Sequence, residues 1–178
     1  MPKTVVVYRS ISGFTRKYAE WLAEELHADL FDARKVDAKK LSEYSLIIFG
    51  GSLHAVGISG VSLIKDNLPS LADKKIIVFA VGASPSKEGI IEEIRENNFS
   101  EQQQGNLKLF YLRGGFNYGK LDFGNKVLMA FFRVRLAFKK NKTPDEKGML
   151  AAYAKPMDFT RKENIREIVD YAKSLIDS

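Results

Sequence analysis

The stretch VVVYRSISGFTRKYAEWL, residues Val5 to Leu22, joins a strand to a helix through a turn rich in hydroxyl groups. Its first four residues form a continuous apolar run, which is typical of a strand covered on both faces in a parallel sheet. From Gly13 onward, apolar residues recur every three or four positions, as on one face of a helix. The stretch therefore predicts a β–turn–α unit. Its turn carries three hydroxyl residues around Gly13, namely Ser10, Ser12 and Thr15.

The rest of the chain continues this alternation of strands and helices. Apolar runs predict strands at 5–8, 28–32, 46–49, 76–81 and 107–111. Helical periodicity predicts helices at 13–26, 59–68, 87–97, 125–140 and 165–176. Thr160 and Glu163 have the spacing of a capping box before the last helix. Strands of the buried type that alternate with helices predict an α/β fold with a doubly wound parallel sheet.

Five strands fit the sheet order 2-1-3-4-5 better than a six-stranded dinucleotide fold does. In that order strands 1, 3 and 4 are neighbours, and ligands bind beyond their carboxyl ends, where the winding reverses. Small and hydroxyl residues cluster after these three strands, at 10–15, 50–52 and 82–84. We therefore expect one domain, residues 1–178, with a ligand site at this edge of the sheet.

The turn after the first strand suits a phosphate group. A helix N-terminus offers unpaired N–H groups and a partial positive charge, and the hydroxyl groups can add hydrogen bonds. The turn matches neither the P-loop nor the Gly-x-Gly-x-x-Gly pattern, which disfavours a nucleoside triphosphate or a dinucleotide. We therefore expect a single compact phosphate. The alternative is that Ser12 only caps the helix.

Composition excludes several other kinds of site. The 178 residues contain no Cys, which removes disulfides and thiolate chemistry, and His27 and His54 alone show no metal-ligand spacing. A phosphorylation-receiver domain needs an Asp after the third strand, where Gly50-Gly51-Ser52 stands. With neither a signal peptide nor a membrane-spanning run in the sequence, we expect a cytoplasmic protein.

Three motifs resemble those of flavodoxin-domain proteins. Ser10-Ile11-Ser12-Gly13-Phe14-Thr15 after a buried strand resembles the FMN-phosphate loop of flavodoxins. Gly50-Gly51-Ser52-Leu53-His54 is similar to the second flavin loop of the subgroup related to menaquinone-dependent protoporphyrinogen oxidase. The run from Arg113 to Leu121, followed by a basic apolar helix, resembles the characteristic insertion of that subgroup, here about residues 116–158.

This resemblance implies FMN as the cofactor, with no separate catalytic residue. The phosphate contacts would come from Ser10, Ser12, Gly13, Phe14 and Thr15. The flavin ring would lie between two loops, one of Ser52, Leu53, His54 and Ala55 and the other of Gly82, Ala83 and Ser84. Ring contacts would involve Leu53 and His54, or Phe116 and Tyr118. His54 either contacts the flavin, with a role in proton transfer, or is an ordinary surface residue.

The segment from Leu107 to Lys142 carries nine Lys and Arg residues against one acid, Asp122. Two apolar stripes run along its predicted helix: Val127, Phe131, Val134 and Phe138 form one, and Leu128, Phe132 and Leu136 form the other. One stripe can pack on the domain, and we expect the second, with Leu128, to face a partner. Helix 126–140 then suits a peripheral contact with the inner face of a membrane, a quinone or an acidic hydrophobic substrate. The alternative is a helix enclosed within the fold, and nucleic acid is disfavoured.

Two redox functions remain open at this point, and a binding module without redox chemistry is a further alternative. The first is an FMN-dependent oxidoreductase that passes electrons between the flavin and a quinone or porphyrinogen-like substrate. The second is a soluble electron carrier that docks on protein partners. Carriers of this fold tend to be acidic, whereas this chain has a formal net charge of +6. The charge favours the enzyme.

Overall fold

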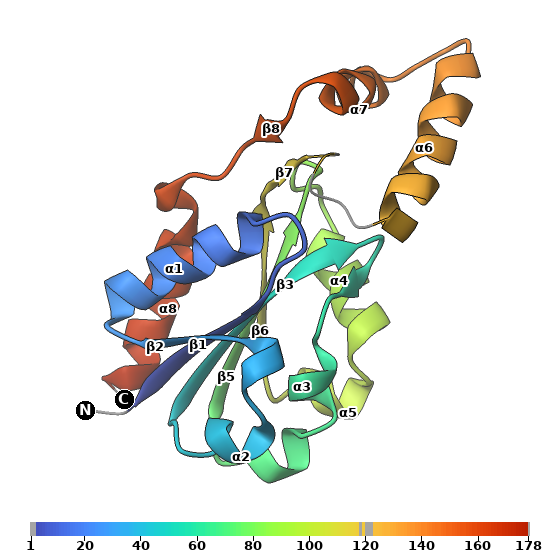
Figure 1. Cartoon of the computed structure of the whole chain (residues 1–178). Coiled ribbons are helices and arrows are strands. Elements are labelled where there is room, and N and C mark those ends of the chain that lie inside the picture. Colours follow the sequence, from blue (N-terminus) through green and yellow to red (C-terminus); the bar gives the residue numbers. More distant parts are fainter. Residues whose placement is uncertain (1–2, 118, 120–122, 178) are drawn as a thin grey trace.

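Five parallel strands form the centre of the molecule, in the order β2-β1-β3-β5-β6 (Figure 1). The computed structural model describes residues 3–117, 119 and 123–177. The strands of this sheet are β1 (Thr4–Arg9), β2 (Asp29–Asp32), β3 (Leu46–His54), β5 (Lys75–Gly82) and β6 (Lys108–Arg113). The order is the one expected from the sequence, 2-1-3-4-5, which confirms the doubly wound α/β fold.

Helices cover both faces of this sheet. The longer helices of the chain are α1 (Phe14–Leu26), α4 (Ile90–Asn98), α6 (Phe123–Phe138), α7 (Pro144–Ala154) and α8 (Arg166–Ile176). Short helices are α2 (Ala38–Leu41), α3 (Ser62–Lys65) and α5 (Glu101–Gln104), with 3-10 turns at Ala33–Lys35, Leu68–Leu71 and Lys162–Ile165. Figure 1 shows α1 and α8 on one face, and α3, α4 and α5 on the other.

The core has two layers, one on each side of the sheet. Val6, Ile48 and Ile77 pack with α1 and α8 on one side. Neighbouring residues such as Val5 and Ile47 pack on the opposite side, under α3 and α4. Because successive side chains of a strand point to opposite faces, a sheet covered on both faces needs continuous apolar runs. This explains the runs from which the strands were predicted.

Three local predictions differ from the structure. The expected helix 59–68 is reduced to α3 and the 3-10 turn Leu68–Leu71. Strand β3 continues to His54 and turns back into β4 (Gly57–Ile58), an antiparallel partner that the sequence did not indicate. The capping box at Thr160 and Glu163 does not form, because the Thr160 amide and hydroxyl both donate to Asp158 Oδ1.

Helices α6 and α7 form an arm, residues 123–154, that stands away from the sheet (Figure 1). The arm leaves after β7 (Gly115–Phe116) and returns through β8 (Met157–Asp158), which pairs antiparallel with β7. The Phe159 amide also donates to the Gly114 carbonyl, at 2.8 Å. The arm therefore has a defined base at the carboxyl edge of the sheet, where the helical insertion was expected.

The orientation of α6 corrects two expectations. The interpretation of a helix enclosed within the fold is wrong, because Val127, Phe131, Val134 and Phe138 are all exposed. This stripe is the more exposed of the two, since Phe132 of the second stripe is 40% exposed and Leu136 is half-buried. The side chain of Leu128, which belongs to the second stripe, lies outside the described part of the structure.

Candidate functional site

A cleft of about 800 Å³ opens at the carboxyl ends of β1, β3 and β5. It brings together ten of the twelve predicted site residues: Ser12, Phe14, Thr15, Ser52, Leu53, His54, Ala55, Gly82, Ala83 and Ser84. The remaining two, Ser10 and Gly13, belong to the turn behind it. Three loops that are far apart in sequence thus meet in one site, as the strand order requires.

The turn from β1 into α1 is built around Gly13. This residue has a φ of 97°, a left-handed conformation that favours glycine. The Ser10 hydroxyl accepts a hydrogen bond from the Gly13 amide at 3.1 Å, which fixes the turn. Gly13 is itself the N-cap residue of α1, and no side chain caps the helix there. The alternative in which Ser12 only caps the helix is therefore wrong.

This turn leaves hydrogen-bond donors unused. Among the described residues, the backbone amides of Ser12, Phe14 and Thr15 have no protein acceptor, and the Ser12 hydroxyl has no partner. Amides at a helix N-terminus, together with the helix dipole, stabilise an anion. Two nearby cations are directed elsewhere, since Arg16 bonds Glu20 and Lys17 pairs with Asp158. A phosphate here would be held by N–H groups and the Ser12 hydroxyl.

Ser52 connects the β1–α1 turn, the candidate phosphate site, to the loop after β3. Its hydroxyl accepts a hydrogen bond from the Ile11 amide at 3.1 Å and shares a second one, at 2.9 Å, with the Thr15 hydroxyl. Thr15 is buried, with 1% of its surface exposed. The hydroxyl groups of Ser52 and Thr15 therefore hold the loops of the site together. Because they already form hydrogen bonds within the protein, they are less available to bind a ligand than the hydroxyl of Ser12.

The second loop is the tip of the β3–β4 hairpin. Leu53 pairs with Ile58 and His54 with Gly57, and Ala55 turns the chain in a left-handed conformation with a φ of 52°. The side chain of His54 is exposed at the rim of the cleft. This position leaves both interpretations of His54 open.

Asn98, which sequence reasoning did not select, holds this hairpin in place. Its side chain is buried, accepts a hydrogen bond from the Ile58 amide and donates to the carbonyls of Val56 and Ile94. A buried amide that satisfies three backbone groups is a strong constraint. Its place directly after the predicted helix 87–97 gave no signal of this contact with a residue 40 positions away.

The third loop follows β5 and is held by β6. The Tyr111 hydroxyl donates to the Ser84 carbonyl at 2.6 Å, and the Gly114 amide donates to the Gly82 carbonyl at 2.7 Å. Burial raises the pKa of Tyr111 further above neutral pH, which favours the protonated phenol that donates this hydrogen bond. A Cβ on Gly82 would come within 2.6 Å of that phenol oxygen. Glycine is needed here because the ring of Tyr111 lies so close.

The base of the arm closes the fourth side of the cleft. Phe116 and Met129 line the cleft, and the Phe116 ring packs edge-on against Tyr153, with centroids 5.3 Å apart. From the sequence, Phe116 was a candidate contact of a flavin ring, and its side chain lines the cleft where such a ring would lie. Tyr118, the other aromatic candidate, lies outside the described residues.

A smaller pocket of about 210 Å³ adjoins the cleft behind Phe116. Its walls include Met157, Phe159 and the guanidinium group of Arg113, which stacks 3.7 Å above the Phe159 ring. Residues 83–85 line both the pocket and the cleft. The walls of the pocket are therefore largely apolar, with one cation, Arg113, and one acid, Glu146, which pairs with Lys139.

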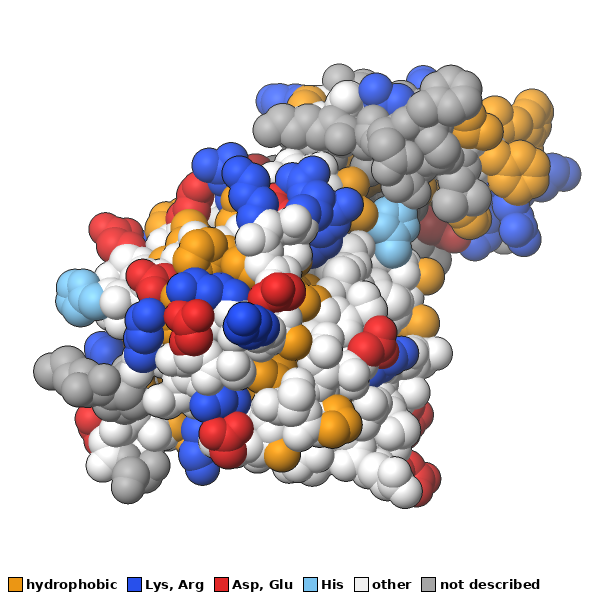
Figure 2. All heavy atoms as spheres, turned by 60° about the horizontal axis from the view of Figure 1, so that its bottom comes forward, with side chains coloured by type: hydrophobic (Ala, Val, Ile, Leu, Met, Phe, Trp, Pro, Cys, Tyr) orange, Lys and Arg blue, Asp and Glu red, His pale blue; other side chains and the backbone are white. Residues whose placement is uncertain are grey.

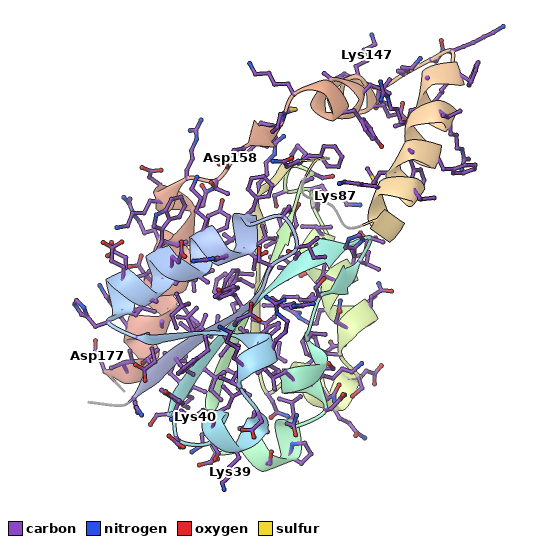
Figure 3. The ribbon with its side chains drawn as sticks, in the orientation of Figure 1. Lys39, Lys40, Lys87, Lys147, Asp158 and Asp177 are labelled. Atoms are coloured by element: carbon purple, nitrogen blue, oxygen red, sulfur yellow. The ribbon has the colours of Figure 1, made fainter. Side chains whose placement is uncertain are left out.

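One ion pair ties the arm's return strand to helix α1. Lys17 Nζ lies 2.9 Å from an Asp158 carboxylate oxygen. Partial burial opposes the ionisation of Asp158, but hydrogen bonds from Thr160 and Lys17 outweigh it and lower its pKa. Figure 3 shows Asp158 at β8 and Lys87 in the loop after β5, on either side of the arm's base. The carboxylate therefore stays ionised and keeps β8 on the domain at neutral pH.

Two other kinds of site find no support in the described residues. Within 3–117, 119 and 123–177, no group of three or more His, Asp or Glu residues is placed to hold a metal ion. In the same part of the chain, no helix has the length and apolar character needed to cross a bilayer.

Comparison with known proteins places this geometry in a family. A family model described as a flavodoxin domain matches residues 5–147, which include the three loops and α6. An uncharacterised protein of Methanocaldococcus jannaschii is 28% identical over 120 residues, covering 66% of this chain and 79% of its own. A putative flavoprotein from Bacteroides uniformis has a TM-score of 0.45 at 23% identity, covering 64% of this chain and 91% of its own.

A flavodoxin of Megasphaera elsdenii has a TM-score of 0.45 at 15% identity, covering 68% of this chain and 89% of its own. The domain model alone spans most of the chain and includes every predicted site residue. Such membership suggests a flavin as the cofactor. From its strand order, its cleft and this match, the chain belongs to the flavodoxin domain family.

Proposed function

We propose that the protein binds one FMN in the cleft and works as an FMN-dependent oxidoreductase. The observation that carries the proposal is the β1–α1 turn, where three backbone amides and the Ser12 hydroxyl have no acceptor among the described residues. They form a site for one phosphate group at the carboxyl edge of the sheet. FMN has a single phosphate, whereas FAD would bring a pyrophosphate to a turn that lacks the glycine pattern for it.

The three loops would then bind different parts of FMN. Ser10, Ser12, Gly13, Phe14 and Thr15 would hold the phosphate, with Ser10 and Thr15 acting mainly by shaping the turn. The ring would lie between the loop of residues 52–55 and the loop of residues 82–84. Bound FMN supplies one- and two-electron transfer, and the protein supplies its position and surroundings.

The pocket behind Phe116 supports an enzyme that acts on a quinone or porphyrinogen-like molecule. It adjoins the loop of residues 82–84 and is largely apolar, and its two charged lining residues are Arg113 and Glu146. A flat apolar substrate with a carbonyl or carboxylate group would fit such surroundings, since arginine donates in a plane to these groups. The alternative is a soluble electron carrier, and the exposed His54 at the cleft rim supports it, because a ring edge there would be open to a protein partner.

The cofactor proposal is tested by titrating the purified protein with FMN, FAD and riboflavin, followed by flavin fluorescence. We expect FMN to bind tightest, because riboflavin lacks the phosphate. Ser12→Ala removes a hydrogen bond to a charged group and should weaken FMN binding by about tenfold or more, while riboflavin binding stays unchanged. Ser86→Ala, in the same cleft but on the opposite loop, is the control. Equal affinities for riboflavin and FMN would contradict the phosphate site.

Enzyme and carrier are separated by the reactions of the flavin-loaded protein under anaerobic conditions. For the enzyme, we expect a soluble quinone to reoxidise the reduced protein quickly, or a porphyrinogen to reduce the oxidised protein. Arg113→Gln should slow these reactions without weakening FMN binding. For the carrier, a ferric heme protein should reoxidise the reduced flavin faster than the quinone does, and Arg113→Gln should have no effect.

A further inference from the structure

The outer side of helix α6 is an apolar ridge open to solvent. Among the described residues, the large hydrophobic side chains that are exposed all belong to α6: Val127, Phe131, Phe132, Val134 and Phe138. Phe131 is 65% exposed and Phe138 is 85% exposed. Exposing such side chains to water costs free energy in proportion to their area, so their concentration on one element indicates a contact surface.

Helix geometry gathers four of these side chains into one line. At about 100° per residue, Val127, Phe131, Val134 and Phe138 fall within an arc of roughly 60°, and we call them the α6 ridge. The opposite side of the helix faces α7, because the Tyr153 hydroxyl donates to the Met129 carbonyl and Arg133 lies over the Tyr153 ring. The α6 ridge therefore points away from α7.

The charge around the α6 ridge is positive. Helix α6 contains Lys126, Arg133 and Arg135 and no acidic residue, and further lysines follow at its C-terminal end. Arg135 and Lys140 have no acidic partner within the described part of the chain. Figure 2 shows hydrophobic and basic side chains next to one another at this outer end of the molecule. A partner must accordingly be apolar at its centre and negatively charged around it.

We propose that the α6 ridge docks on the surface of an anionic lipid bilayer, with α6 lying in the plane of the membrane. The phenylalanine rings would enter the boundary between headgroups and acyl chains, and the basic side chains would bind the headgroups. A second copy of the chain fits less well, because it would bring two positive surfaces together. Nucleic acid fits less well because the middle of the surface is apolar.

The docking is independent of the cofactor and is measured on the full-length protein. The protein is mixed with vesicles of phosphatidylcholine alone or with about 30% phosphatidylglycerol, and bound protein is separated by flotation. We expect binding to the anionic vesicles at low salt, at least about tenfold stronger than to the neutral ones, and release as salt is raised.

Two pairs of substitutions test which residues carry this binding. Phe131→Ser with Phe138→Ser, and separately Arg135→Gln with Lys140→Gln, should each weaken binding to the anionic vesicles by about tenfold or more. The control is Lys39→Gln with Lys75→Gln, which removes the same charge from exposed residues at the amino ends of the strands. All these side chains are exposed, so an unchanged circular dichroism spectrum is expected throughout.

Three results would overturn the proposal. The first is the absence of binding to anionic vesicles at low salt. The second is equal loss of binding in the control variant, which would indicate only a general attraction of a basic protein. The third is a dimer in sedimentation velocity experiments that the Phe131→Ser and Phe138→Ser pair dissociates, which would assign the α6 ridge to a second copy of the chain.

Discussion

At the scale of single residues, Ser52 shows how the cleft is assembled. Its hydroxyl lies between the Ile11 amide of the first loop and the Thr15 hydroxyl of helix α1. It thereby fixes the β1–α1 turn against the end of β3. A buried hydroxyl such as that of Thr15 needs a partner, since an unsatisfied polar group in the interior costs free energy.

Ser52→Ala should therefore weaken the hydrogen bonds that hold the site together and leave the hydrophobic core intact. The Ile11 amide and the Thr15 hydroxyl both lose a partner, which should cost about 1–3 kcal/mol of folding free energy. FMN affinity should fall by about tenfold, because the turn is no longer fixed in its binding conformation. Urea unfolding and flavin titration measure the two effects. Ser86→Ala, a serine of the same cleft with an exposed side chain, should change neither.

The sequence indicated the residues of the site better than it indicated their supports. Hydroxyl and glycine clusters after strands 1, 3 and 4 were visible because loops at the switch point have a distinctive composition. Asn98 and Tyr111 were not visible, although they hold the 55–58 and 82–84 segments. Each stands in an ordinary helix or strand, and its function depends on a contact with a distant loop.

At the scale of elements, the base of the arm depends on close packing at Gly115. A Cβ at this position would collide with the Met157 carbonyl of β8 and come within 2.7 Å of the Phe14 ring. The pairing of β7 with β8 thus requires a glycine, which the Gly114-Gly115 sequence supplies. The same position connects the arm to Phe14 of the candidate phosphate turn.

Gly115→Ala should destabilise the protein, whereas Gly148→Ala on α7 should stabilise it. The first substitution forces apart two backbones and should cost about 1–3 kcal/mol, lowering Tm by several degrees. The second adds a methyl group in open space within a helix, where alanine is favoured by up to about 1 kcal/mol. Thermal unfolding of both variants measures the difference. Equal shifts would show that the β7–β8 contact is unimportant.

The periodicity of apolar residues predicted the long helices and strands. It did not predict the orientation of α6, because that helix has two apolar stripes. Both stripes of α6 have helical spacing, so the sequence could not show which one faces α7. The choice follows from Tyr153 and its hydrogen bond to Met129, a contact between helices. Strands β4, β7 and β8 have two residues each and no pattern of their own, and they form only because longer elements bring their backbones together.

At the scale of the whole molecule, the fold has two parts. The sheet and its covering helices contain the hydrophobic core, and the arm carries the exposed α6 ridge. Both buried clusters, as far as the structure describes them, consist of residues of the sheet and of the helices packed on it. None of their buried members lies in residues 117–157. Stability therefore belongs to the flavodoxin core, and the arm is free to carry a function of its own.

The division can be tested by removing the arm at its base. Phe116 and Met157 are directly opposite each other in the β7–β8 pair, so an Asn-Gly turn can join them in place of residues 117–156. The shortened protein should fold cooperatively, because both core clusters are intact. It should still bind FMN, with an affinity lowered by no more than about tenfold, since the cleft loses only the wall that includes Met129.

Binding to anionic vesicles should disappear in the same shortened protein, and its reaction with a long-tailed quinone should slow more than that with a short one. Circular dichroism, FMN titration and vesicle flotation measure these outcomes separately. A shortened protein that cannot fold would show that the arm is part of the core after all. One that folds but binds no FMN would show that the arm, and not the three loops, holds the cofactor.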